Sequence, residues 1–94
     1  MKHYIIVKLE EGIDKEALVK PVSELFNETL SIPGIHSVSV KPCVINRPNR
    51  YDLMIEIEME PEALPAYDES SPHHRWKEEY GHMIAKKTIF DCEN

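Results

Sequence analysis

The sequence predicts an α+β protein with a ferredoxin-like fold, in which one four-stranded antiparallel sheet carries helices on one face. The chain of 94 residues is long enough for a single domain, 1–94. Its apolar residues alternate in some short stretches and recur at three- and four-residue spacing in others. These stretches follow one another as strand, helix, strand, strand, helix in two pieces and strand, which is the order of the split βαβ arrangement.

The N-terminal half begins with a strand over residues 2–9, whose apolar side chains on both faces are typical of a central strand. A helix follows over residues 14–30, where apolar residues share one face and Asp14 is placed to cap the first turn. Pro21 predicts either a kink or a regular helix that starts there, because proline removes one hydrogen bond from a helix interior. The segment Ile32-Pro33-Gly34 ends this helix.

Two further strands are predicted over residues 35–45 and 51–60. Pro42 cannot donate to a ladder, so the first of them is an edge strand or carries a bulge. In the second, apolar residues alternate with glutamates, which predicts one wet face rather than a metal site. The turn at residues 46–50 holds two arginines and fits either a solvated hairpin tip or an anion-binding loop.

The C-terminal part predicts a short helix over residues 61–67, a second helix over residues 73–84 and a last strand over residues 88–92. Pro72 restarts the chain between the two helices, because its fixed φ suits a first helical turn. Ser70 or Ser71 is suited to cap that turn by accepting a hydrogen bond from a free backbone N–H.

Composition excludes some classes of partner. The net charge is -6 at pH 7, and a nucleic-acid partner is not expected because binding phosphates needs a basic face. No apolar run approaches the ~20 residues of a membrane span, and no signal peptide is recognisable, so we expect a cytoplasmic protein without a membrane partner. Cys43 and Cys92 lack C-x-x-C spacing, and we expect reduced thiols there.

In the predicted sheet, the first and third strands are central and the second and fourth are edges. Cys43 and Cys92 then lie near opposite edges, too far apart for a disulfide within one chain. The face without helices also carries apolar side chains from the first strand, and an uncovered apolar sheet face marks an interface. We therefore expect a second copy to cover it, giving a two-fold homodimer whose sheets close as a barrel.

Five segments in this order and spacing resemble the stress-responsive A/B barrel domain (Dabb) family, a branch of the dimeric α/β barrel superfamily. Together they cover nearly the whole chain. The segments are Lys2-His3-Tyr4-Ile5-Ile6-Val7-Lys8-Leu9, Ile32-Pro33-Gly34, Tyr51-Asp52-Leu53, Tyr67 with Pro72-His73-His74, and Ile89-Phe90-Asp91.

The resemblance implies a homodimer with an internal cavity in each subunit. Most members of the family have no assigned reaction. Some plant members are polyketide cyclases, in which a His and a Tyr lining the cavity act as an acid–base pair in an intramolecular aldol condensation, without metal or organic cofactor. A cofactor-free monooxygenase, as in other branches of the superfamily, is a third alternative by fold analogy alone.

Carried over residue by residue, the cyclase Tyr matches Tyr67, and the cyclase His matches His73 by its spacing. The usual Pro-x-His wording of the family selects His74 instead, whereas helical geometry favours His73. The His of the first strand matches His3. Leu53 stands where the cyclases carry a His early in the third strand, which speaks against their specific reaction in this chain.

Two functions from different classes follow. The first is a non-catalytic homodimer that binds a small apolar or aromatic molecule, or acts in stress protection. The second is a cofactor-free enzyme in which His73 removes a proton next to a carbonyl and Tyr67 stabilises the oxyanion that forms. Both residues also have a purely structural interpretation, His73 as a packing residue at a helix start and Tyr67 as filling between sheet and helices. The candidate ligand-binding residues are His3, Leu53, Trp76 and Tyr80.

His74, Glu78 and His82 are spaced four apart, a spacing that can place ligands around Zn²⁺. On a helix, however, they lie opposite the apolar stripe that contains Trp76, so we expect a solvated face and predict no metal site. Cys92 has no basic partner nearby in the sequence and is not expected to be a nucleophile.

Overall fold

The computed structural model describes residues 1–94 and places four strands and three α-helices in the predicted order. Short 3₁₀ turns extend the helices at Glu28–Ser31, Pro61–Ala63 and Gly81–Met83. The regular elements are β1 (Lys2–Leu9), α1 (Lys15–Asn27), β2 (Ile35–Pro42), β3 (Leu53–Met59), α2 (Leu64–Asp68), α3 (Ser71–Tyr80) and β4 (Ile84–Cys92).

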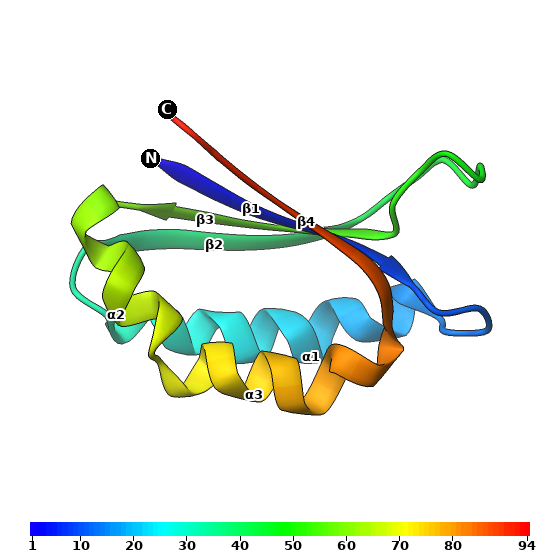
Figure 1. Ribbon diagram of the computed structural model, residues 1–94, viewed down its shortest axis with the longest axis horizontal. Coiled ribbons are helices and arrows are strands. Elements are labelled where there is room, and N and C mark those ends of the chain that lie inside the picture. The colour runs from blue at the N-terminus through cyan, green and yellow to red at the C-terminus, as the bar shows by residue number, and fades with distance from the viewer.

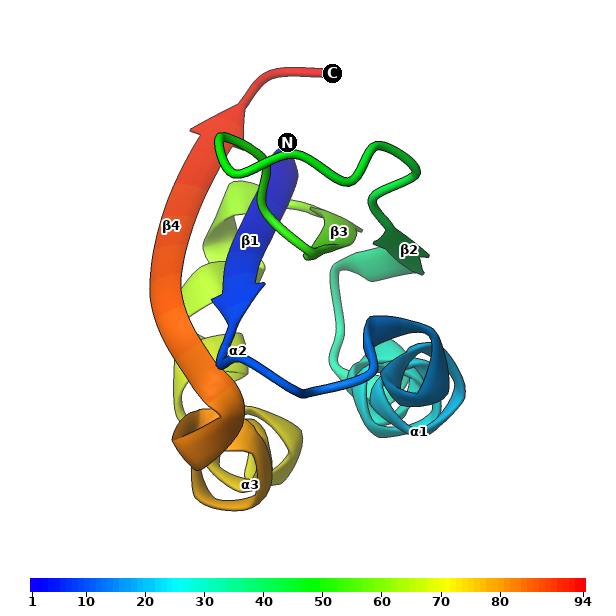
Figure 2. The same ribbon diagram turned by 90° about the vertical axis from the view of Figure 1, so that its right-hand side faces the viewer.

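The strands form one antiparallel sheet in the order β2-β3-β1-β4, so the prediction of two central and two edge strands is confirmed. In the register, His3 lies opposite Ile57 on β3 and opposite Asp91 on β4. The first strand therefore pairs with the last one, and the two chain ends lie close together (Figures 1 and 2).

All helices lie on one side of the sheet, which leaves the other face open (Figures 1 and 2). The odd-numbered residues of β1 and β3 point to the helices and are buried, while the even-numbered ones are half-buried on the open face. The core forms between the sheet and the helices, where Phe26 of α1 contacts Trp76 of α3 edge-on at a ring-centroid distance of 5.2 Å. This arrangement is the α+β, ferredoxin-like fold predicted from the order of elements.

Local sequence signals explain where α1 begins and ends. Asp14 accepts a hydrogen bond from the Glu16 N–H at 3.0 Å, as predicted for the cap. Pro21 lies inside the helix, and the chain passes through it without a break in α1. Gly34 has a φ of +94°, a conformation that favours glycine, and a Cβ there would approach the Ala63 side chain to 3.1 Å.

Several predicted boundaries differ from the structure. The helix expected over residues 73–84 ends at Tyr80, and β4 begins at Ile84 rather than at Thr88. The reason is that β4 is an exposed edge strand, so its residues do not alternate between apolar and polar. The second strand ends at Pro42, after which Cys43 and Val44 enter an exposed loop.

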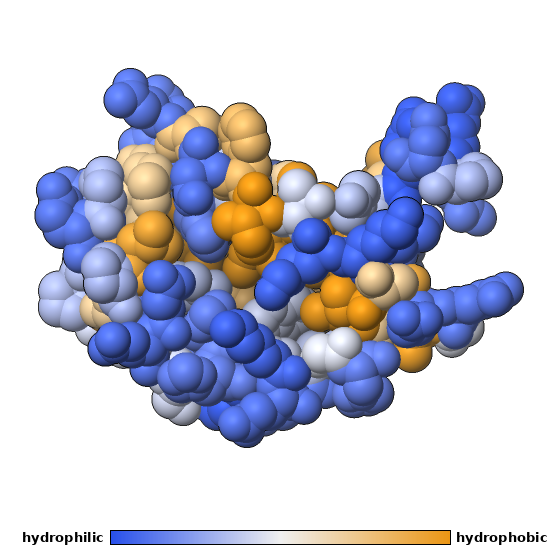
Figure 3. All heavy atoms as spheres, in the orientation of Figure 1, coloured by the Kyte–Doolittle hydropathy of each residue, from blue (hydrophilic) through white to orange (hydrophobic).

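The helices are short and polar on their outer side. Figure 3 shows mostly hydrophilic atoms over the helices, and apolar patches at the level of the sheet and where the sheet meets the helices. None of the helices combines the length and the hydropathy that a membrane crossing requires.

Candidate functional site

A cavity of about 270 Å³ lies between the two C-terminal helices and the β1–β4 edge of the sheet. Strands contribute one wall, and α2 and α3 contribute the other. The lining residues are His3, Ile5, Leu64, Tyr67, Asp68, His73, Trp76, Lys77, Lys87, Ile89 and Asp91. Four of the predicted site residues, His3, Tyr67, His73 and Trp76, are therefore brought together at one place.

Tyr67 lies at the centre of this group, on α2. Its ring is 4.8 Å from the His73 ring and 5.5 Å from the His3 ring, measured between centroids. The side chain is 1% exposed, and its hydroxyl is buried with no hydrogen-bond partner. Burial, with a smaller contribution from the charge of Asp68, raises the pKa of Tyr67 well above its usual range. The phenol thus stays protonated and keeps a hydrogen-bond donor that no group of the fold uses.

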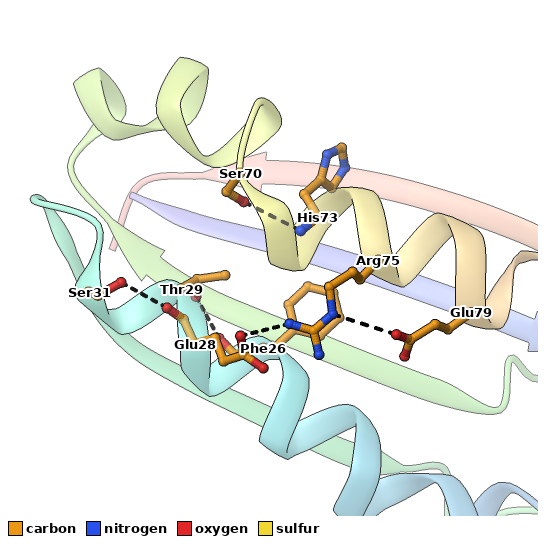
Figure 4. A network of polar contacts seen from close by, with 8 residues as sticks. All are labelled: Phe26, Glu28, Thr29, Ser31, Ser70, His73, Arg75 and Glu79. Carbon is orange, nitrogen blue, oxygen red and sulfur yellow. Dashed lines mark hydrogen bonds and ion pairs between the residues drawn. The ribbon is translucent and has the colours of Figure 1, made fainter.

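His73 is held at the first turn of α3. The Ser70 hydroxyl caps this turn by accepting from the His73 backbone N–H at 3.4 Å (Figure 4). The His73 ring lies with its Nδ1 2.9 Å from the Asp68 carbonyl oxygen, and because a carbonyl can only accept, Nδ1 carries the proton. In the neutral ring Nε2 is then an unprotonated acceptor. Burial is the main cause that lowers the pKa of His73, so the neutral form prevails at pH 7.

His3 is fixed in a similar way from the sheet. It is 6% exposed, and its Nδ1 lies 2.5 Å from Oδ1 of Asp91 on the neighbouring strand. The imidazole N–H donates to the carboxylate, which orients the ring and leaves Nε2 as the remaining nitrogen. The strand register places the two residues directly opposite each other, so the pair is built into the β1–β4 ladder.

The wall formed by α3 depends on helical spacing. His73, Trp76 and Lys77 share one face of α3, and Trp76 packs between Phe26 of α1 and Tyr80. Arg75, on the side of α3 facing α1, pairs with Glu28 at 2.8 Å and with Glu79 at 3.5 Å (Figure 4). The two helices are thus tied together beside the cavity.

Three other predicted site residues lie elsewhere. Leu53 is buried near the far end of β3, opposite Val7, and does not line this cavity. Tyr80 lies beyond Trp76 and also falls outside the lining, while His74 is exposed on α3. Of the two histidines after Pro72, it is His73 that lines the cavity.

Four polar residues of the lining were not predicted as site residues: Asp68, Lys77, Lys87 and Asp91. A signal for Asp91 was available, since antiparallel pairing of the first and last strands in register puts it opposite His3. Lys77 follows His73 by one helical turn, and Lys87 and Asp91 share one face of β4.

The face with His74, Glu78 and His82 is less regular than predicted, because α3 ends before His82 and that residue lies in the 3₁₀ turn Gly81–Met83. Across the chain, no three or more His, Cys, Asp or Glu side chains cluster closely enough to hold a metal ion. Cys43 and Cys92 are both free thiols.

No family model matches the sequence, and no curated protein matches it significantly. Solved structures match it closely in fold. A dimeric protein of unknown function with a ferredoxin-like fold from Bacteroides fragilis superposes with a TM-score of 0.78 at 15% identity, over 99% of this chain and 94% of that one. A protein from Arabidopsis thaliana gives a TM-score of 0.77 at 16% identity, over 99% and 93% of the two chains.

A Dabb family protein with a ferredoxin-like fold from Mesorhizobium loti gives a TM-score of 0.70 at 11% identity, over 99% of this chain and 94% of that one. At such identities the likeness concerns the fold. The chain therefore has the ferredoxin-like fold of these proteins, one of which is named as a member of the Dabb family that the sequence resembles.

Proposed function

We propose that this protein is a homodimer that binds a small molecule in the cavity between its C-terminal helices and its sheet. The observation that carries the proposal is the Tyr67 hydroxyl, which is buried in the cavity wall without a partner. An unpaired buried hydroxyl costs roughly 1–3 kcal/mol of stability. A ligand oxygen that accepts from this hydroxyl removes that cost, so the site favours an occupant with such an oxygen.

The other lining residues indicate the polarity and the size of the ligand. Ile5, Leu64, Ile89 and Trp76 supply apolar contact area around the polar centre. A cavity of about 270 Å³ is at the small end of ligand sites and fits a body of about one ring. The proposed ligand is thus a small apolar or aromatic molecule with an oxygen at its inner end.

The homodimer is proposed from the open face of the sheet. Its centre is apolar, with Tyr4 and Ile6 on β1, Met54 on β3 and the 58%-exposed Phe90 on β4. Tyr4 lies opposite Phe90, and Ile6 opposite Met54, so these side chains are neighbours on one face. A depression of about 480 Å³, partly lined by Ile6 and Met54, lies at one end of it.

Charge on this face is arranged for a two-fold contact. Glu56 and Glu58 lie towards one end of the open face, where Lys2 pairs with Glu56 at 3.5 Å, and Lys8 and Lys86 lie opposite each other at the other end. A second copy turned by 180° would lay its basic end over the acidic end of the first, as a self-complementary interface requires. Structural neighbours from Bacteroides fragilis, Thermobifida fusca and Jannaschia are described as dimeric, which supports the same assembly here.

A second candidate function is acid–base catalysis on a carbonyl compound, and the His73–Asp68 hydrogen bond favours it. That bond leaves Nε2 unprotonated in the neutral ring of His73, which lines the cavity beside a Tyr67 that stays protonated. The imidazole would take a proton from the carbon next to the carbonyl, and the electron pair would move to the carbonyl oxygen. Tyr67 would donate to the oxyanion that develops there. Leu53 at the position of the third cyclase histidine makes a reaction other than the plant cyclisation the better expectation.

The binding proposal is tested with the full chain purified without additives. Native mass spectrometry should give the mass of a dimer and of any retained molecule. Trp76 is the single tryptophan and lines the cavity, so its indole N–H gives one NMR cross-peak that reports occupancy. A fragment that shifts this peak in the wild type should bind more weakly to Tyr67→Phe and equally to Tyr80→Phe. A screen in which no fragment moves the peak would contradict the proposal.

The proposed acid–base catalysis is tested separately, by the exchange of carbon-bound protons for deuterium. Acetophenone dissolved in D₂O exchanges its methyl protons slowly, and a base in the cavity should accelerate this exchange above the buffer rate. The acceleration should disappear in His73→Ala and persist in His74→Ala, its exposed neighbour. Equal rates with wild type, with His73→Ala and without protein would argue against the enzyme and leave the binding proposal in place.

A further inference from the structure

Two lysines stand on opposite walls of the cavity at its solvent end. Lys77 is on α3, one turn after His73, and Lys87 is on β4, on the same face of the strand as Ile89 and Asp91. Both side chains are exposed, whereas Tyr67 at the inner wall is buried. The cavity thus changes from a polar but uncharged inner end to a charged outer end.

Neither lysine is neutralised by an ion pair of the fold. The ion pairs of the structure involve Lys2, His3, His36 and Arg75, and none involves Lys77 or Lys87. The charge of Lys77 is felt inside the cavity, where it adds to burial in lowering the pKa of His73. Two ammonium groups without an ion-pair partner therefore line one cavity.

Two carboxylates, Asp68 and Asp91, also line the cavity and offset part of the charge of the two lysines. Asp91 already accepts a hydrogen bond at its Oδ1 from the His3 ring. Asp68 is exposed at the end of α2, close to His73. The aspartates weaken the attraction for any anion, so a carboxylate is favoured most where it lies close to both ammonium groups and away from the carboxylates.

From this arrangement we infer that the ligand is a small organic acid, bound as its monocarboxylate with the carboxylate between Lys77 and Lys87. Its apolar body fills the space beside Trp76, and an oxygen at its far end meets the Tyr67 hydroxyl and Nε2 of His73. The inference rests on the proposed binding function and adds the ligand class. It depends on two lysines of this chain rather than on the fold alone.

The test compares 4-hydroxybenzoate with 4-hydroxybenzamide, which has the same shape and no charge. The hydroxyl of either probe can accept from Tyr67 and donate to His73, and only the acid carries a carboxylate at pH 7. Affinities are read from the Trp76 indole cross-peak of the full-length protein. We expect the acid to bind about fivefold to tenfold more tightly, since each partly exposed charge pair contributes modestly. Added salt should reduce the binding of the acid and leave that of the amide unchanged.

Matched variants then assign the preference to the two lysines. The double variant Lys77→Gln/Lys87→Gln should bind the acid and the amide equally. Lys20→Gln is the control, because Lys20 is exposed on α1 and belongs neither to the cavity lining nor to the open face of the sheet. It should keep the full preference of the wild type for the acid.

The outcomes separate the inference from the proposal beneath it. If the wild type binds both probes equally, the acid class is wrong and the cavity still binds small molecules. If the acid is preferred but the double variant keeps the preference, the lysines are not its cause and the inference fails. If neither probe moves the Trp76 peak while other fragments do, the inference is overturned and the binding function stands.

Discussion

His3 on the first strand and Asp91 on the last strand form a side-chain hydrogen bond of 2.5 Å across 88 residues of sequence. The pair lies at the rim of the cavity, with the His3 ring against Tyr67. The buried imidazole is therefore held by a carboxylate from the edge strand. This makes the β1–β4 pairing a condition for the geometry of the site as well as for the sheet.

Removing the Asp91 carboxylate should lower the stability of the protein. Asp91→Ala leaves the Nδ1–H of a 6%-exposed His3 without a partner, and we expect the free energy of unfolding in urea to fall by about 1–3 kcal/mol. Asp91→Asn keeps an acceptor oxygen and should cost less. The control is Glu60→Ala, which removes the carboxylate of the exposed His36–Glu60 pair and should change stability by under ~0.5 kcal/mol. Equal losses in the two alanine variants would show that burial of His3 does not matter.

Tyr67→Phe should stabilise the protein although it removes a polar group from the candidate site. The hydroxyl has no partner, so its loss ends a desolvation penalty, and the ring remains to fill the core. We expect the free energy of unfolding to rise by about 1 kcal/mol. Tyr80→Phe, at a half-buried tyrosine outside the cavity, serves as the comparison and should be neutral. A clear loss of stability in Tyr67→Phe would mean that the hydroxyl is satisfied by an ordered water.

The stability of the protein should depend on pH through His73. Its pKa in the folded state lies below the ordinary value of about 6.5, chiefly because of burial, so the unfolded state binds the proton more tightly. Above about pH 6.5 the ring is neutral in both states and folding stability is at its full value. The stability then decreases as the pH falls through the lowered pKa, because the unfolded state takes up the proton first. Between about pH 8 and about pH 5, wild type should therefore lose more stability than His73→Asn, which has no titrating ring.

The NMR titration of the His73 ring is the direct measurement of the same effect. Its midpoint should be lower in the folded protein than in urea-unfolded protein. A midpoint at or above the unfolded value would remove both the pH effect and the assignment of a neutral base to this residue.

The proposed dimer predicts a difference between two exposed apolar residues. Phe90→Glu places a charge in the apolar centre of the open face, and we expect sedimentation to show monomers with an unchanged circular dichroism spectrum. Leu30→Glu changes a residue of similar exposure on the helix side, where no second copy is proposed, and should leave the dimer intact. Wild type that sediments as a monomer at micromolar concentration would exclude the assembly.

The fold was predictable because its strongest signals are periodic. β1 was predicted with its observed bounds, and β3 followed from the alternation of apolar residues with glutamates. The start of β4 was missed because Ala85, Lys86 and Lys87 lie on an exposed edge strand, where neither face imposes a pattern. The start of an edge strand such as β4 is set by its pairing with a neighbouring strand. The local sequence carries no signal for that pairing.

The candidate site was predictable only in part, because some of its residues come together through contacts between elements far apart in the sequence. Tyr67 and His73 are close in sequence, and the resemblance to a family pointed to both. Asp91 and Lys87 reach the cavity through the β1–β4 register, and Lys77 through the way α3 lies over the sheet. Leu53 was predicted as a site residue because it corresponds to a histidine position of the family, but it does not line the cavity.

The pairing of the first strand with the last also has a consequence for folding kinetics. β2 and β3 follow each other along the chain, whereas the β1–β4 ladder joins the two ends of the chain, from Leu9 opposite Ile84 to Lys2 opposite Cys92. Contacts of such large sequence separation are entropically slow to form. The cavity, whose strand wall is the β1–β4 edge, is thus expected to assemble in the late steps of folding, so a chain with an unpaired β4 would retain much of its core and bind nothing.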